Sequence, residues 1–368
     1  MRFPEFSGEW EKKRFKDVCN ITTGNKNTQD KSDDGIYPFY VRSQNVERIN
    51  SWTFDGEAIL TAGDGVGVGK VFHYSTGKIG VHQRVYILSD FKCDGKYLYS
   101  YFAGNFYNRV KRMSAKNSVD SVRMEMIADM PISLPSTMEQ KKIGHLLALL
   151  DERIATQNKI IEKLESLIKG LSQRLLSPKQ GWTSYKLDEL CQIKSGYSGI
   201  QVSFQTAYKV SRIETISNHC INMSRIGFVK EIPQEYKLRV GDILFSNINS
   251  VQYIGNTAFI DKDYGLYHGM NLLRIVPDSR IVFPRFIHLL LCSERLLRHF
   301  QSICNKAVSQ ASINQTSLGK TIMTIPSYKE QQHICSIIES VERKLDIETS
   351  LLKMLQYQKQ YLLRQMFI

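Results

Sequence analysis

The sequence predicts a mixed α+β fold in which two globular parts alternate with two long helices. Three observations predict it: a heptad pattern in two stretches, a shared motif where each stretch starts, and a second repeat that opens each globular part. The chain has 368 residues, which is enough for two or three domains. We expect globular parts at residues 1–134 and 179–325, and helices at residues 135–178 and 326–368.

The first long helix is predicted from apolar residues that recur in alternating steps of four and three. They are Ile143, Leu147, Leu150, Ile154, Ile161, Leu164, Ile168, Leu171 and Leu175. Such spacing forms a heptad seam. Ser136 and Glu139 stand at the spacing of a capping box, and Ser177 before Pro178 is a stop signal. Because a helix with one apolar stripe cannot stand alone in water, a partner helix is required.

That partner is predicted at the end of the same chain. A shift of 191 residues superimposes Pro135, Ser136, Glu139, Gln140, Ile143, Leu164 and Leu171 on Pro326, Ser327, Glu330, Gln331, Ile334, Leu355 and Leu362. Gln157 interrupts the first seam, and Glu348 interrupts the second at the corresponding place. A polar layer of this kind fixes register at some cost in stability. The alternative is two unrelated surface helices, which would not share cap, seam and polar layer together.

The globular parts also repeat. Trp10, Cys19, Ile21 and Gly24 recur 172 residues later as Trp182, Cys191, Ile193 and Gly196. The offset grows to 191 at the helices, so the second copy has gained a net 19 residues (191 − 172), mostly before Gly241. Strands are predicted at 37–42, 57–62, 70–74 and 84–89, and again at 242–246, 257–260 and 271–276. Shorter helices are predicted at 97–112 and 284–303, and a polar turn at 178–181 separates the copies.

Composition favours a basic, cytoplasmic protein. No run of 18 apolar residues exists, so no membrane span is expected. The seven cysteines form no CxxC pair, which favours reduced thiols. The formal net charge of +13 makes a polyanion the natural partner, and nucleic acid is the commonest one. The alternative is a basic protein without such a partner.

Motifs for catalysis are missing from the sequence. The glycine-rich run at 63–70 fails the phosphate-loop pattern, because Asp64 stands where the first glycine belongs and Val71 where Ser or Thr should follow. Its glycines suit a tight hairpin turn or a close approach to a ligand. No HExxH or GxSxG motif occurs, and no His or Cys pair has metal-ligand spacing. We therefore expect no cofactor, no metal and no catalysis, and a binding protein.

Two globular parts, each followed by a helix that opens with the PSxxEQ motif, resemble the DNA-specificity subunits of Type I restriction-modification systems. The resemblance rests most on residues 135–143 (PSTMEQKKI) and 326–334 (PSYKEQQHI), and also on the opening RFPEFSGEW. It implies two target-recognition domains that each bind half of a split site in double-stranded DNA. It further implies an antiparallel helix pair with a pseudo-twofold axis, two modification (methyltransferase) subunits as partners, and restriction subunits outside them.

Base-reading candidates are polar side chains clustered with glycine or aromatic residues. In the first part they are Arg42, Ser43, Gln44, Asn45, Asp64, Lys70, His82, Gln83, Arg84, Lys116 and Asn117. In the second they are Tyr197, Ser198, Ser246, Asn247, Asn249, Gln252, Tyr253, His268, Gln310 and Asn314. Arg109, Lys111, Arg112, Arg295 and Arg298 suit phosphate contacts or solvated helix faces. For each candidate the alternative is a solvated loop side chain.

Two other functions stay open at this point. One is a DNA-modifying enzyme with an unrecognised site, which would methylate or cleave DNA without partners. The other is a helical scaffold that joins proteins and does not bind DNA.

Overall fold

Both predicted long helices are present in the computed structural model, as α4 (Thr137–Leu175) and α9 (Tyr328–Met366). The structure describes residues 2–65, 67–113, 121–306 and 310–367. The chain divides into two compact units, and each helix contributes to both of them. Unit 1 comprises Met1–Ile160 with Glu348–Ile368, and unit 2 comprises Ile161–Ile347.

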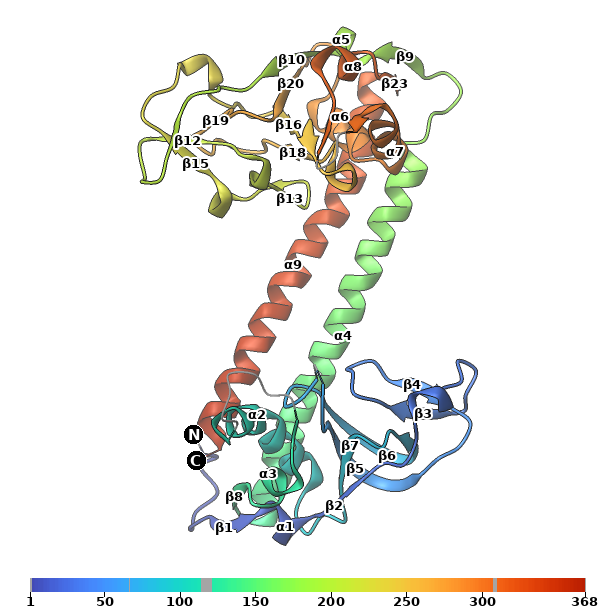
Figure 1. Ribbon diagram of the computed structural model, residues 1–368, viewed down its shortest axis with the longest axis vertical. Helices are drawn as coiled ribbons and strands as arrows, with labels where there is room; N and C mark the ends of the chain where they lie inside the picture. The colour runs from blue at the N-terminus through green and yellow to red at the C-terminus, as the bar shows by residue number, and fades with distance from the viewer. Residues whose placement is uncertain (1, 66, 114–120, 307–309, 368) are drawn as a thin grey trace. The chain divides into compact units, whose positions relative to one another are not determined.

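Within each unit the segments of α4 and α9 lie side by side and run antiparallel (Figure 1). In unit 1, Asp151 of α4 pairs with Lys359 of α9, and Gln157 pairs with Glu348. Residue numbers therefore increase along α4 in the direction in which they decrease along α9. The seam residues Ile143, Leu147 and Leu355 are buried, as the heptad pattern predicts. The mixed α+β class and the antiparallel pair are therefore confirmed.

The PSxxEQ motif ties each helix to its globular part. Gln140 Nε2 donates to the carbonyl oxygen of Pro135 (2.7 Å), and its Oε1 accepts from the amide of Asp94 (3.0 Å). Gln331 repeats both bonds, to Pro326 (3.0 Å) and from Phe283 (2.8 Å). Ser136 and Ser327 each accept from the amide three residues on, at 3.4 Å. The motif thus fixes where the long helix starts against the shorter helix of its unit.

Unit 1 is built on one curled six-stranded sheet with the order β2-β7-β5-β6-β3-β4. Its strands are β2 (Asn20–Thr23), β3 (Tyr37–Tyr40), β4 (Glu47–Ile49), β5 (Phe54–Ala62), β6 (Phe72–Val81) and β7 (Val85–Ser89). Helix α2 (Gly95–Met113) covers one face, and Phe102 and Phe106 lie in the core there. The rest of the unit is β1 (Glu11–Arg14), which pairs with β8 (Pro131–Leu134), and the short helices α1 (Phe15–Val18) and α3 (Met124–Ala128).

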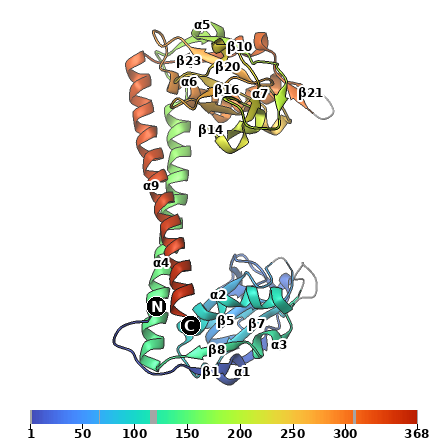
Figure 2. The same cartoon turned by 90° about the vertical axis from the view of Figure 1, so that its left-hand side faces the viewer.

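The end of α9 closes the core of unit 1. Phe367 lies edge-on to Tyr97 and Tyr101 of α2, with ring centroids 5.2 and 5.3 Å apart. Figure 2 shows this end of the chain, marked C, beside α2. Met366 is buried in the same cluster. The last turn of α9 is thus part of the first globular core.

Unit 2 repeats the plan with a divided sheet. The order β10-β20-β16-β18 corresponds to β2-β7-β5-β6 of unit 1. These strands are β10 (Cys191–Ser195), β16 (Ile243–Phe245), β18 (Thr257–Phe259) and β20 (Leu273–Pro277). A second sheet holds β11 (Gln201–Val202), β12 (Tyr208–Val210), β15 (Gly227–Val229) and β19 (Leu266–Tyr267), and β13 (Ile216–Ser217) pairs with β14 (Cys220–Ile221). Most of these additional strands precede Gly241, where the sequence predicts the insertions.

The helix predicted over 284–303 is two helices, α6 (Pro284–Leu291) and α7 (Glu294–Ile303). The break follows from Ser293, whose hydroxyl accepts from the amide of Leu296 (3.4 Å) and so caps a new helix. Phe286 and Phe300 bury the two helices against the main sheet. Unit 2 is completed by β9 (Thr183–Lys186), α5 (Leu187–Leu190), β17 (Ile248–Asn249), β21 (Asn305–Lys306), β22 (Ala311–Ser312), α8 (Gln315–Gly319) and β23 (Ile322–Ile325).

Candidate nucleic-acid interface

The curl of the sheet in unit 1 brings three loops together. Strand β3 pairs with the last residues of β6, Gly80 and Val81. The same strand also reaches the first half of β6, because Tyr40 donates to Ser75 Oγ (3.0 Å) and its ring lies 5.0 Å from His73. The loops that follow β3, β5 and β6 therefore meet at one edge. They carry the predicted residues 42–45, 64–70 and 82–84.

Asp64 joins two arginines at this edge. Its Oδ1 accepts from Arg42 Nη1 (2.8 Å), and its Oδ2 accepts from Arg84 Nη1 (2.6 Å). The side chains of Arg42 and Arg84 are 44% and 61% exposed, whereas that of Asp64 is 18% exposed. Burial acts to raise the pKa of Asp64, but the hydrogen bonds and charges of the two arginines outweigh it and leave this pKa below its usual value. The carboxylate is therefore ionised at neutral pH.

A glycine lets the backbone at residue 67 pass close to Arg42. A Cβ added at Gly67 would lie 2.4 Å from the carbonyl oxygen of Arg42, and Gly65 has a φ of +78°. Only glycine suits both conditions. Lys70 lies over the ring of Tyr107, 5.4 Å from its centroid. The glycine-rich run thus shapes a surface loop that presents Asp64 and Lys70.

The neighbouring polar residues of unit 1 divide into exposed and buried ones. Ser43, Gln44 and Asn45 are exposed, and Gln83 Nε2 donates to Asn27 Oδ1 (2.7 Å). His82 is buried, accepts at Nδ1 from the amide of Arg84 (3.1 Å) and lies 3.3 Å from Thr28 Oγ1 through Nε2. It shapes the turn, so we leave it out of the proposed contact surface. Lys116 and Asn117, with Ser118 beside them, lie outside the described residues.

In unit 2 the loop 246–253 presents fewer side chains than predicted. Ser246 is buried, and its hydroxyl accepts from Asn249 Nδ2 (3.1 Å). Asn247 Nδ2 is 3.4 Å from the carbonyl oxygen of Ile313, and within the described part of the chain its buried Oδ1 has no hydrogen-bond partner. Gln252 and Tyr253 are exposed. The loop therefore exposes Gln252 and Tyr253 to solvent, whereas Ser246 and Asn247 hold its shape.

His268 and Asn314 have structural places. His268 is 1% exposed and its Nε2 lies 3.0 Å from the carbonyl oxygen of Leu272. Burial lowers the pKa of His268 to about 4, so this imidazole is neutral at pH 7. The side chain of Asn314 caps α8 by accepting from the amide of Ser317 (2.7 Å). We leave His268 out of the proposed contacts because it cannot reach a ligand on the surface.

The remaining candidates of unit 2 lie nearer the surface. Tyr197 is half-buried, with its ring 5.3 Å from that of Tyr236, and Ser198 beside it is exposed. Gln310 is exposed. Among the predicted phosphate contacts, Arg109 Nε donates to the carbonyl oxygen of Met126 (2.7 Å), while Arg298 pairs with Glu294 one turn away. Arg295 and Arg112 are exposed helix residues.

One segment of the candidate interface was not predicted from the sequence. Residues 26–28 lie against the turn at His82, with Lys26 bridged to His82 and Asn27 bonded to Gln83. The repeat could have pointed to them, because the same offset of 172 that relates Gly24 to Gly196 relates Lys26 to the predicted Ser198. The exposed Asn27 and Thr28 therefore belong to the same surface as Gln83 and Arg84.

A profile of the family described as "Type I restriction modification DNA specificity domain" matches residues 7–166 and again residues 179–357. The chain belongs to this family. The MjaVIII specificity subunit of a type I restriction enzyme from Methanocaldococcus jannaschii is 24% identical over 396 residues, which cover 95% of this chain and 89% of that relative. The expected family is thereby confirmed.

Other relatives match over shorter stretches. The EcoDI specificity subunit of a type I restriction enzyme from Escherichia coli is 27% identical over 169 residues, 46% of this chain and 37% of the relative. A further Methanocaldococcus jannaschii protein, MjaX, is 32% identical over 194 residues, 51% of this chain and 46% of its own length. The chain thus spans less than half the length of these two relatives.

Two solved structures share the fold of this family. The chain of a crystal structure described as a Type-I restriction-modification system S subunit from M. genitalium superimposes with a TM-score of 0.70 at 16% identity, over 100% of this chain and 99% of that one. A second chain, from a structure concerned with complex assembly of the type I R-M system, has a TM-score of 0.56 at 14% identity, over 99% and 98% of the two chains. At these identities the likeness shows the fold alone.

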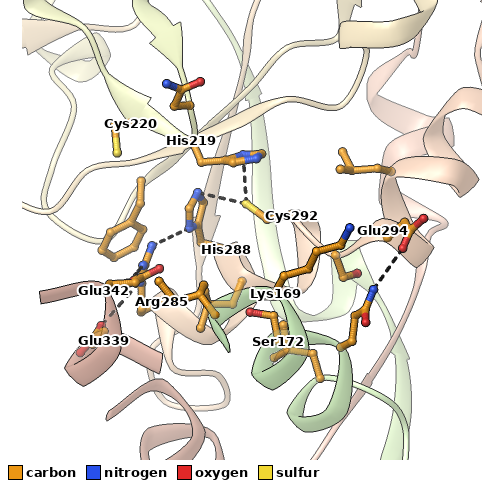
Figure 3. A pocket seen from close by; sticks show the side chains of 18 of the residues that line it. Lys169, Ser172, His219, Cys220, Arg285, His288, Cys292, Glu294, Glu339 and Glu342 are labelled. Carbon is orange, nitrogen blue, oxygen red and sulfur yellow. Dashed lines mark hydrogen bonds and ion pairs between the residues drawn. The ribbon is translucent and has the colours of Figure 1, made fainter. Parts of the chain in front are cut away.

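This member of the specificity family also has a cavity of about 1210 Å³ in unit 2, between α6, the residues around β14 and the unit's segments of α4 and α9 (Figure 3). Cys292 Sγ lies 3.3 Å from His219 Nδ1 and 3.5 Å from His288 Nε2. Arg285 Nη1 donates to His288 Nδ1 (2.8 Å), so the proton of this imidazole is on Nε2. Burial raises the pKa of Cys292 to about 12, which keeps the thiol protonated at neutral pH and disfavours a nucleophile.

Across the described ranges, no group of three or more His, Cys, Asp or Glu side chains is placed to hold a metal ion. Nor is any described helix sufficiently long and apolar to cross a membrane.

Proposed function

We propose that this chain is the DNA specificity subunit of a type I restriction-modification enzyme and binds a split target in double-stranded DNA. The observation that carries the proposal is the family's DNA specificity domain, which matches twice, with each match centred on a different globular part. A chain with two different DNA-recognition domains is expected to bind a target with two different half-sites. Catalysis then belongs to partner subunits, and the chain itself supplies recognition.

The charge and the loop chemistry support contact with DNA. The net charge of +13 provides phosphate attraction, and Arg, Gln and Asn are the side chains that recognise base edges. The proposed contacts in unit 1 are Arg42, Ser43, Gln44, Asn45, Asp64, Lys70, Gln83 and Arg84, with Asn27 added. Those in unit 2 are Tyr197, Ser198, Asn249, Gln252, Tyr253 and Gln310.

Partner subunits are expected to dock on the long helices. On α9 within unit 1, Met354, Tyr357 and Tyr361 are 60%, 71% and 56% exposed and lie three and four residues apart, so they form one apolar stripe. Large exposed apolar residues in a row mark a protein contact more often than a solvated face. This stripe supports the proposal that modification subunits bind the helices. We further propose that restriction subunits bind outside them, as the family resemblance implies.

The test is selection from a library of randomised duplex DNA by the full chain, expressed together with its modification subunits. The expected result is a split motif with an unread gap and two different half-sites. Binding should weaken steeply as salt rises, because each neutralised phosphate contributes about −0.9 to the log–log slope. No enrichment, or binding that does not depend on salt, would contradict the proposal.

A second measurement separates this function from the two alternatives. The chain alone is incubated with target DNA, S-adenosylmethionine and magnesium, and methyl transfer and strand cleavage are measured. We expect neither reaction until the partner subunits are added. Methylation or cleavage by the chain alone would favour an enzyme, and a complex that assembles but fails to bind DNA would favour a scaffold.

A further inference from the structure

We propose that Asp64 is a positioning residue that holds Arg42 and Arg84 as a fixed pair of guanidinium groups for reading guanine in the half-site bound by unit 1. This inference rests on the proposed function. It concerns how one recognition surface achieves its specificity, and it is carried by the geometry of three loops that lie 20 and 22 residues apart in sequence.

The carboxylate of Asp64 is held in place by its backbone. The amide of Gly63 donates to the carbonyl oxygen of Arg84 (2.8 Å), and the carbonyl oxygen of Gly63 accepts from the amide of Val122 (2.7 Å). Asp64 itself forms an isolated antiparallel bridge with Ser121. A side chain on so constrained a segment can fix the direction of its partners.

The two guanidinium groups keep donors available for a ligand. Each arginine uses Nη1 for Asp64. The other edge of a guanidinium group, with Nη2 and Nε, is the edge that can donate two parallel hydrogen bonds. Both side chains are substantially exposed. A bidentate bond from arginine to O6 and N7 of guanine is the commonest base-specific contact in the major groove, which makes guanine the base that such a pair selects.

Asp64 is also needed to keep the pair together. Two guanidinium groups repel one another, and long side chains lose conformational freedom when they are held. A shared carboxylate offsets the repulsion and sets the orientation before DNA arrives, and such preorganisation favours the correct base over the others. An exposed ion pair adds little to folding stability by itself. If the ion pairs of Asp64 served folding alone, removing them would therefore leave discrimination between bases unchanged.

The sign of the charge gives the inference a distinctive signature. A carboxylate on a basic surface repels phosphates, so its removal should strengthen non-specific DNA binding. The same removal should release the arginines and weaken discrimination between bases. Opposite changes in these two quantities are not expected from a general loss of structure, which would weaken both.

The experiment uses the full chain, expressed with its modification subunits, and the target that the wild-type complex selects. D64N is compared with wild type on targets in which guanines of one half-site at a time are replaced. We expect D64N to lose about 5- to 100-fold in discrimination at guanine positions of one half-site, with the other half-site unchanged. Its affinity for unrelated DNA should be equal to wild type or higher. D64E, which keeps the charge, should recover part of the discrimination.

Asp129 provides the matched control, because it too joins two cations in unit 1, Arg14 (3.0 Å) and Lys16 (2.8 Å), on residues remote in sequence from the three loops. D129N should leave discrimination at both half-sites unchanged. If D64N fails to fold, R42K and R84K replace it, since lysine keeps the charge but lacks the planar fork.

The outcomes separate the inference from the proposed function. Full discrimination in D64N, or an equal loss at both half-sites, would overturn the inference while the function stands. A wild-type complex that prefers no sequence would instead remove the proposed function. Retained discrimination in both R42K and R84K would overturn the inference in the same way.

Discussion

At the scale of single residues, His268 is almost wholly buried, and its imidazole Nε2 faces the carbonyl oxygen of Leu272. His82 holds the corresponding turn of unit 1 and is buried as well. The two histidines recur 186 residues apart, and the structure gives them a shared role in shaping the turns beside the exposed loops. Recurrence alone could not separate this role from ligand contact, because burial depends on strands that are distant in sequence.

The buried His268 makes unit 2 sensitive to acid. Its pKa is about 4 in the folded chain and about 6.5 when unfolded, so the unfolded state binds more protons between these values. The contribution of the neutral His268 to stability is therefore fully present above pH 6.5 and is lost as the pH falls toward 4. From pH 7 to pH 5 we expect His268 alone to lower the free energy of unfolding of unit 2 by about 2 kcal/mol. Burial also lowers the pKa of His219 and of His288 in this unit, so these two imidazoles add to the loss in the same direction.

Urea unfolding followed by the fluorescence of Trp182 measures this loss, in a chain whose other two tryptophans, Trp10 and Trp52, are replaced by phenylalanine. H268Q should be less stable at pH 7 but change less between pH 7 and pH 5. H145Q, on an exposed position of α4, is the control and should keep the wild-type slope. An unchanged slope in H268Q would show that another group titrates.

The role of a residue could be predicted from the sequence where it depends on residues nearby in the chain. It could not be predicted where it depends on contacts between distant segments. Ser136 and Glu139 identify a helix start because a cap is local. The bond network of Arg42, Asp64 and Arg84 could not be derived from the sequence, because the curl of β6 brings these residues together. Ser246 is polar and lies next to a loop, so the sequence suggests that it is exposed. It is buried, because tertiary packing covers it.

At the scale of elements, Gln140 and Gln331 connect the starts of α4 and α9 to the chain before α2 and α6. Each side chain is buried and makes two hydrogen bonds to the backbone. Replacement by alanine leaves a buried carbonyl and a partly buried amide without a hydrogen-bond partner, which costs about 1–3 kcal/mol. We expect Q140A to destabilise unit 1 and Q331A to destabilise unit 2 by this amount.

Unfolding monitored separately by tryptophans of unit 1 and of unit 2 checks the expectation. The control is Q173A, because Gln173 is exposed on α4 and makes one long bond, 3.4 Å, to Glu294. It should change stability by less than about 0.5 kcal/mol. Equal effects of Q140A and Q173A would contradict the assigned role of the motif.

The polar layer of the helix pair is a second element with a measurable consequence. Gln157 Nε2 donates to both the carbonyl oxygen (3.1 Å) and the carboxylate of Glu348, and both side chains are buried. Replacing both residues by leucine should stabilise unit 1 by about 1–4 kcal/mol, since an apolar layer removes buried polar groups. Q157L alone removes a donor to a buried carboxylate and should destabilise the unit.

The measurement is the free energy of unfolding of the double leucine variant and of Q157L, each compared with wild type. A destabilised double variant would mean that the layer contributes to stability beyond its role in register. The sequence indicated this layer correctly because an interruption of a heptad seam is visible in one dimension.

At the scale of the whole molecule, the chain is a duplication that has diverged in the globular parts and kept its helices. Four strands of the main sheet correspond between the units, whereas the strands from β11 to β15 have only partial counterparts. The sequence predicted the class, the helices and most core strands because apolar periodicity is local. It gave no register for the second sheet of unit 2, whose strands are only two or three residues long.

The continuous helices predict a fixed gap between half-sites. Adding one heptad to both helices keeps the seams in phase and lengthens each by about 10 Å, which corresponds to about three base pairs of DNA. The methylated motif of the lengthened variant should keep both half-sites with a wider gap, reduced by any bending of DNA. An unchanged gap with full activity would rule out the helices as the spacer.

The central claim is that one chain reads two different half-sites. Sequencing the methylated positions in the genome of a host that carries the intact system tests it most directly. The account predicts one split motif with unlike half-sites and an unread gap of about 6–7 base pairs, on a spacing of one helical turn between half-site centres. A single uninterrupted motif, or a palindrome with identical halves, would contradict it.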